Sequence, residues 1–93
     1  MVKWLEIIKL RRAGNGEEIL GEFLGSLANS GQIGELIEIR TYRHASFESD
    51  LNVHLYWESE RPEPNGSALG LRLAQVLEEF GLMNHSVWID EEK

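Results

Sequence analysis

Two neighbouring segments of the chain alternate apolar and polar residues with a period of two. In the segment 50–58, the apolar residues Leu51, Val53, Leu55 and Trp57 alternate with Asn52, His54, Tyr56 and Glu58. In the segment 35–44, Ile37, Ile39 and Thr41 alternate with Glu38, Arg40, Tyr42 and His44. Successive side chains of a strand point to opposite faces, so each segment predicts a strand with one apolar and one polar face. The short polar segment 45–49 between them predicts an antiparallel hairpin.

The rest of the chain predicts two helices and two more strands. Residues 2–12 are apolar on both faces, which is typical of a central strand. A capping-box pattern at Asn15 and Glu18 predicts a first helix, which the segment 29–31 ends. Ser67 is the expected N-cap of a second helix that reaches Phe80. Residues 85–90 alternate again and predict the last strand.

The order strand-helix-strand-strand-helix-strand predicts an α+β, ferredoxin-like βαββαβ plait. Right-handed crossovers place both helices on one face of a four-stranded antiparallel sheet. Odd-numbered hairpin residues, Ile37, Ile39, Leu51, Val53, Leu55 and Trp57, are expected to face the helices. Even-numbered hairpin residues are expected to face away from them. A length of 93 residues fits one domain, 1–93.

The net charge of −7 lies in the second half of the chain. Residues 1–45 balance six Lys/Arg against six Asp/Glu, whereas residues 46–93 hold three Lys/Arg and ten Asp/Glu. Nucleic-acid binding requires clustered positive charge, so we expect no nucleic-acid partner. No apolar run approaches a membrane span and no secretory signal precedes Glu6, so we expect no membrane partner. The absence of cysteine fits a cytoplasmic protein.

The polar face of the hairpin is the candidate site. We expect Arg40, Tyr42, His44, Asn52 and Glu58 to contact a ligand. His54 titrates near neutral pH and neighbours Tyr56, so these two residues are the candidates for catalytic proton transfer. An ordinary cross-strand polar pair on a solvated sheet is the alternative.

Aromatic residues on this face predict a partner. The face is expected to include Trp4 or Ile8, together with Tyr42, Tyr56 and Trp88. An exposed area of this kind favours a second copy stacked against it, which makes a symmetric homodimer. For Trp88 itself, a place in the core beneath the helices is an equal alternative. Because His85 and Trp88 are three residues apart, they must lie on opposite faces.

Two hairpin registers are compatible with the sequence, and they bear on metal binding. A five-residue loop places His44 opposite Asp50 and His54 opposite Arg40, so the histidines are about 13 Å apart. A three-residue loop places His44 opposite Asn52 and brings it within about 7–8 Å of His54. No close histidine spacing typical of a metal site is present, and we expect no metal.

The hairpin resembles a known family. The segment from Gly34 to Arg43, followed by a strand that ends in Tyr56-Trp57-Glu58-Ser59, resembles the antibiotic biosynthesis monooxygenase-like group of dimeric α/β barrels. This resemblance implies a homodimer whose two sheets enclose a cavity for a small aromatic or quinone-like ligand. It also implies, for some members, oxidation of polycyclic phenols by O₂ without a cofactor.

This chain departs from the family at the position at which members carry a histidine that ligates haem. The breaker segment 61–66 occupies that place, and the expected helix 67–80 has no histidine. We therefore expect no cofactor. The family's monooxygenases use an asparagine and a tryptophan, whereas Asn52 and Trp57 lie on opposite faces of their strand by parity.

Three functional hypotheses follow from the sequence. The first is a dimeric barrel that binds a small aromatic ligand, with or without cofactor-independent monooxygenase activity. The second is a non-catalytic dimerisation or protein-interaction module. An RNA-binding sheet shares the fold but lacks the basic charge and the aromatic pair expected of one.

Overall fold

The computed structural model describes residues 1–11, 16–30, 35–47 and 50–91. Along this part of the chain the elements are β1 (Val2–Arg11), α1 (Gly16–Ser30), β2 (Leu36–Arg43), β3 (Leu51–Ser59), α2 (Ala68–Leu77), a 3₁₀ turn (Glu78–Phe80) and β4 (Leu82–Ile89). This is the predicted order of strands and helices.

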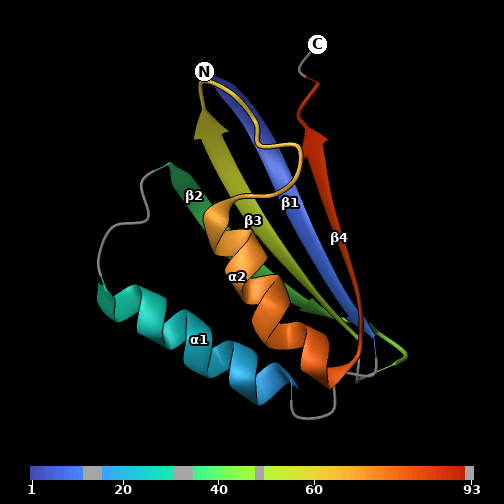
Figure 1. The fold of residues 1–93 in the computed structure, drawn as a ribbon. Helices are drawn as coiled ribbons and strands as arrows, with labels where there is room; N and C mark the ends of the chain where they lie inside the picture. Colours follow the sequence, from blue (N-terminus) through green and yellow to red (C-terminus); the bar gives the residue numbers. More distant parts are fainter. Residues whose placement is uncertain (12–15, 31–34, 48–49, 92–93) are drawn as a thin grey trace.

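The four strands form one antiparallel sheet in the order β2-β3-β1-β4. Both helices cover the same face of it, with α2 over the centre and α1 alongside (Figure 1). Strand β1 is central, as its two apolar faces predict. The arrangement is α+β and is compatible with a ferredoxin-like fold. Neither described helix is long and apolar enough to cross a membrane.

Strand β3 confirms the predicted alternation. Its burial switches at every residue, and the buried set is Leu51, Val53, Leu55, Trp57 and Ser59. These side chains contact the core that the helices cover, together with Leu20 of α1 and Leu69, Leu73 and Leu77 of α2. The even-numbered side chains, including those of His54 and Tyr56, lie on the opposite face.

The residues of β1 on the uncovered face are not those that the sequence predicted. Trp4 pairs with Trp57 and Ile8 pairs with Val53, so both are buried beneath the helices and not on the uncovered face. The rings of Trp4 and Trp57 stack with centroids 5.4 Å apart. Paired residues of neighbouring strands point to the same side of a sheet. Leu5 and Ile7 are therefore the β1 residues on the uncovered face.

Ile37 does not face the helices, although the prediction for odd-numbered hairpin residues placed it there. The β2–β3 register shifts between Leu36 and Glu38, so Ile37 is the extra residue of a β-bulge. A bulge reverses the alternation locally, because two residues then oppose one on the partner strand. Leu36 takes the inward place, and the side chain of Ile37 is 57% exposed.

The last strand begins earlier than the sequence predicted. Strand β4 begins at Leu82, directly after Gly81, because it pairs with β1 along its whole length. Helix α1 ends at Ser30, within the segment 29–31 where the sequence predicted its end. Strand β1 is described to Arg11, and both its predicted last residue, Arg12, and the expected cap, Asn15, lie outside the described residues. Ser67 caps α2 as predicted, with its side chain accepting from the Gly70 N–H.

Candidate functional site

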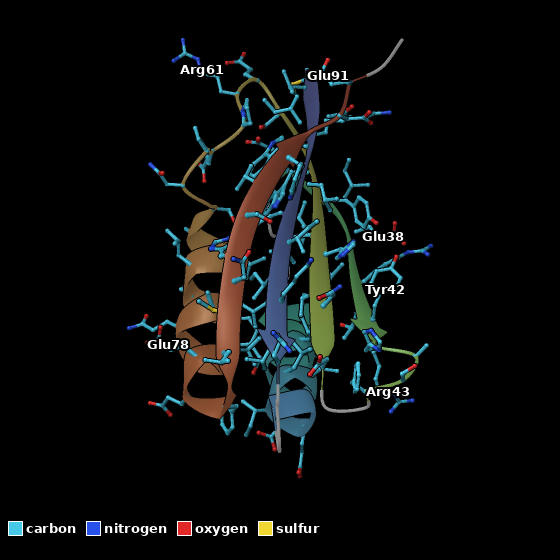
Figure 2. All side chains as sticks on the ribbon, turned by 90° about the vertical axis from the view of Figure 1, so that its right-hand side faces the viewer. Glu38, Tyr42, Arg43, Arg61, Glu78 and Glu91 are labelled. Atoms are coloured by element: carbon cyan, nitrogen blue, oxygen red, sulfur yellow. The ribbon has the colours of Figure 1, made fainter. Side chains whose placement is uncertain are left out.

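The face of the sheet away from the helices is called here the open face. Its residues, from the strand registers and the bulge, are Lys3, Leu5, Ile7, Lys9 and Arg11 of β1, Ile37, Glu38, Arg40 and Tyr42 of β2, Asn52, His54, Tyr56 and Glu58 of β3, and Leu82, Asn84, Ser86 and Trp88 of β4. Seen edge-on, side chains including Glu38 and Tyr42 project from the sheet with no helix over them (Figure 2).

The hairpin has the register of the longer loop. Arg40 lies opposite His54, Tyr42 lies opposite Asn52, and the His44 N–H donates to the Asp50 carbonyl. His44 Nδ1 accepts from the N–H groups of Ser46 and Phe47, so this ring is part of the turn. His44 and His54 are therefore far apart along the sheet. Among the described residues, no group of three His, Cys, Asp or Glu side chains could hold a metal ion.

A tyrosine–histidine cluster occupies the middle of the open face. The rings of Tyr42 and His54 are in contact, with centroids 4.7 Å apart. The Tyr56 hydroxyl lies 3.5 Å from His54 Nδ1, which is a long hydrogen bond. Next to this cluster, Arg40 Nε donates to Glu38 Oε1 at 2.7 Å.

The electrostatics of this cluster favour uncharged rings. Hydrogen bonding to Tyr42 and partial desolvation raise the pKa of the Tyr56 phenol. Desolvation lowers the pKa of His54, and the Lys9 ammonium lowers it further. Hydrogen bonds to Glu38 and Tyr42 raise the pKa of Arg40. At neutral pH the cluster therefore presents a neutral imidazole, which is a proton acceptor, beside a fixed cation.

We expect the imidazole of His54 to titrate below its ordinary pKa of 6.5 in the folded protein. The stability that His54 contributes is complete above pH 6.5 and is lost as the pH falls through the lowered value, because the unfolded chain binds the proton more readily. Proton NMR of the imidazole resonances measures this midpoint. Lys9→Met raises it towards 6.5, whereas the control Arg72→Met on α2 leaves it unchanged. A midpoint at or above 6.5 would contradict the assignment.

A pocket of about 370 Å³, the terminal pocket, lies where the chain termini meet the sheet. The side chains of Leu5, Ile37, Tyr56 and Trp88 line it on the open face. The Trp88 indole is 58% exposed, yet its Nε1–H donates to Ser86 Oγ at 2.9 Å. Trp88 pairs with Leu5, which places it on the open face and not in the core. This hydrogen bond restrains the ring beside a mostly apolar hollow.

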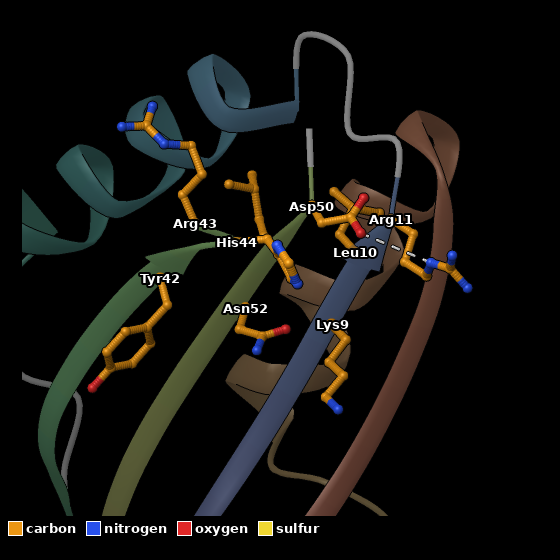
Figure 3. Close-up of a pocket in the computed structure, with 9 residues that line it drawn as sticks. Lys9, Leu10, Arg11, Tyr42, Arg43, His44, Asp50 and Asn52 are labelled. Atoms are coloured by element: carbon orange, nitrogen blue, oxygen red, sulfur yellow. Dashed lines mark ion pairs between the residues drawn. The ribbon is translucent and has the colours of Figure 1, made fainter. Parts of the chain in front are cut away.

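A second pocket, of about 210 Å³, lies at the opposite end of the open face (Figure 3). Lys9, Asn52 and Tyr42 project from the neighbouring strands β1, β3 and β2, and His44 lies just beyond the end of β2. Arg11 Nε lies 3.9 Å from Asp50 Oδ2. This hairpin pocket carries positive charge, because Lys9, Arg11 and Arg43 line it together with Asp50.

The expected site residues therefore divide into three groups. Arg40, Tyr42, His54 and Tyr56 come together in the cluster. His44 and Asn52 line the hairpin pocket. Glu58 is four residues from His54, about 13 Å along the strand, and pairs across the sheet with Lys3.

Sequence reasoning missed the terminal pocket. Its floor depends on the bulge at Ile37 and on the register that brings Leu5 beside Trp88. One signal in the sequence could have indicated this pocket, because β1 carries apolar residues on both of its faces. The helices cover only one face of the sheet, so Leu5 and Ile7 have no layer of side chains packed over them.

A buried carboxylate beneath the helices was also missed. Glu6 has no exposed surface. Its Oε1 accepts from Ser67 Oγ at 2.6 Å and from Trp57 Nε1 at 3.1 Å. Its Oε2 accepts from the Ser67 N–H at 3.1 Å and lies 2.5 Å from His85 Nε2. A Cβ at Gly70 would overlap this carboxylate, so a larger residue there would displace it.

This network has a structural role. Ser67 Oγ donates to Glu6 and accepts from the Gly70 N–H, so it makes no contact with His85 that could activate it as a nucleophile. Within the described residues every buried side-chain polar atom has a partner. The carboxylate joins β1, β3 and β4 to the first turn of α2.

Comparisons with models of known protein families, with curated proteins and with solved structures find no match for this chain.

Proposed function

We propose that the open face binds a small planar aromatic ligand in the terminal pocket. The observation that carries this proposal is the Trp88 indole, which is exposed but restrained by its hydrogen bond to Ser86. An exposed apolar ring normally gains little from a fixed orientation. A ligand that stacks on a ring already restrained in this way binds more tightly, because the ring loses less rotamer entropy on binding.

The composition of the pocket supports an aromatic ligand. Leu5, Ile37 and Tyr56 provide apolar walls, and the volume of about 370 Å³ is within the range of small-molecule sites. Offset stacking on an indole contributes about 0.5–1.5 kcal/mol beyond the burial of apolar area. Lys3 and Glu38 at the rim supply polar groups that orient a ligand.

We propose further that a second copy covers this face and that the protein is a dimeric α/β barrel of the antibiotic biosynthesis monooxygenase-like kind. In that setting O₂ would oxidise a phenolic ligand to a quinone without a cofactor: the ligand supplies the electrons, one oxygen atom enters the product and the other leaves as water. His54 would accept the phenol proton in the first step, and Tyr56 would orient the imidazole. The lowered pKa of His54 supports this role, because the ring is then neutral at pH 7.

Calorimetric titration with 2-naphthol tests the binding proposal. We expect the wild type to bind it and Trp88→Leu to bind it about tenfold more weakly, since the stacking surface is lost. Leu71→Ala is the matched control, because Leu71 is exposed on α2 behind the sheet. Thermal melting should be the same in all three proteins. Equal affinity in wild type and Trp88→Leu would refute the site.

Failure of the wild type to bind 2-naphthol would favour the alternative function, a dimerisation or protein-interaction module. The observation that favours this alternative is the pair of exposed apolar side chains, Ile37 and Trp88, at one end of the sheet. Apolar patches of this kind often mark a protein contact.

A further inference from the structure

The open face is electrically neutral although the chain carries a net charge of −7. The half nearer the termini, the acidic half, holds Lys3 against Glu38, Glu58 and Asp90, a net −2. The other half, the basic half, holds Lys9 and Arg11 against Asp50, a net +1, and Arg40 in the row between the halves adds one positive charge beside Glu38. Among the described residues the face is thus a dipole without net charge. Two copies meet no overall repulsion there.

This charge pattern selects one way of stacking two copies. When the strands of two stacked sheets are aligned, the twofold axis between the sheets runs either along the strands or across them. An axis along the strands would put each half against the same half of the partner, so like charges would face each other. An axis across the strands puts the acidic half of one copy on the basic half of the other. Electrostatic complementarity favours this second, antiparallel arrangement.

The size of the face is sufficient for such a contact. Four strands spaced about 4.8 Å apart and sharing about 27 Å of length give about 500 Å² per copy, or about 1,000 Å² in total. This is near the lower limit for a specific interface. Stacked sheets lie about 10 Å apart, so side chains of one sheet reach the other.

The antiparallel arrangement brings Lys9 of one copy over the terminal pocket of the other. Lys9 pairs across the sheet with Asn52, two rows of side chains from the row of Leu5, Tyr56 and Trp88. Reversal about an axis through the middle row, that of Ile7 and His54, exchanges these two rows. Within one chain Lys9 is about 13 Å along the strand from Leu5, too far to close the pocket.

We propose that the aromatic pocket is completed by the partner subunit's Lys9, and that its ligand is an aromatic acid. Trp88, Leu5 and Tyr56 of one copy contact the ring, and the ammonium of the partner subunit's Lys9 binds the carboxylate. This inference rests on the proposed function, and it adds the class of ligand and a site shared between two copies. Lys9 has no carboxylate partner among the described residues, so it is available for this contact.

The ligand class is tested with 6-hydroxy-2-naphthoate, which is 2-naphthol with one added carboxylate. The wild type should bind it about tenfold or more tightly than 2-naphthol, because a charge-assisted hydrogen bond is added. Lys9→Met should remove this preference and leave binding of 2-naphthol unchanged. Preference retained in Lys9→Met would overturn the role of Lys9.

Mixing two variants tests whether the site is shared. Trp88→Leu and Lys9→Met are refolded together in equal amounts, so that half of the dimers hold one copy of each. Each mixed dimer then has one complete site, and about a quarter of all sites should bind 6-hydroxy-2-naphthoate with wild-type affinity. If both residues served the same chain, mixing would restore no site. That result would overturn the inference and leave the proposed function intact.

The reciprocal mixture is the control. Wild type refolded with the double variant K9M/W88L should retain only about a quarter of the sites, since every mixed dimer has two broken ones. Retention of about half would show that both residues act within one chain. A sedimentation mass near 10.6 kDa at micromolar protein would likewise refute the shared site.

Discussion

Leu55→Asp abolishes cooperative unfolding of this domain. Leu55 has no exposed surface and lies in the middle of β3, where it packs into the core that the helices cover. The substitution removes a buried apolar side chain, which costs about 2–5 kcal/mol, and leaves an unpaired carboxylate in its place. The sum is comparable with the whole stability of a typical domain, about 5–15 kcal/mol. Circular dichroism during heating should show no sigmoidal transition.

The control for this substitution is Leu71→Asp. Leu71 lies on the outer side of α2 and is 49% exposed, so its replacement should shift the melting temperature by only a few degrees. The fluorescence of Trp4 and Trp57 gives a second measurement, since both indoles are buried in the same core. A cooperative melt in Leu55→Asp would show that odd-numbered residues of β3 do not face the helices.

Glu6→Ala is expected to have the next largest effect, a loss of about 3 kcal/mol or more in the free energy of unfolding. The substitution leaves the Ser67 N–H, the Ser67 hydroxyl and the Trp57 indole N–H without their acceptor. Each is buried away from water, so each then bears a desolvation penalty with no compensating hydrogen bond. His85 loses its partner as well. Chemical denaturation measures the change.

Glu22→Ala is the matched control, because Glu22 is an exposed glutamate of α1 and its loss should change stability by less than about 0.5 kcal/mol. Hydrogen exchange locates the damage. The Gly70 and Leu71 amides, which donate to Ser67, should exchange faster in Glu6→Ala than the amides of β3. Equal stability of Glu6→Ala and wild type would mean that the carboxylate does not hold α2 on the sheet.

Much of the fold could be predicted because its signals are local. Alternation in β3 assigned the face of Leu55 and His54 without any knowledge of the other strands. Ser67 marked the start of α2 because a hydroxyl side chain satisfies the free N–H groups of a first turn. The same alternation predicted that Arg40, Tyr42, His54 and Tyr56 lie on one face of the hairpin. Homodimerisation, the ligand and catalysis are predictions that the experiments above decide.

The misplaced residues have non-local causes. The bulge that turns Ile37 outwards arises from the pairing between β2 and β3, and no residue near Ile37 in the sequence indicates it. Trp4 was assigned to the wrong face because the face of a central strand is set by its partners. Both of its faces are apolar, so alternation alone could not decide.

By itself, the sequence determined the order of strands and helices and the inward and outward sides of the central hairpin. Those properties depend on residues within a few positions of one another. The tertiary structure alone decided the terminal pocket, the exposure of Trp88 and the buried network of Glu6. The physical reason is distance along the chain, because Glu6 meets Ser67 across 61 positions and His85 across 79. Only the folded sheet brings such residues into contact.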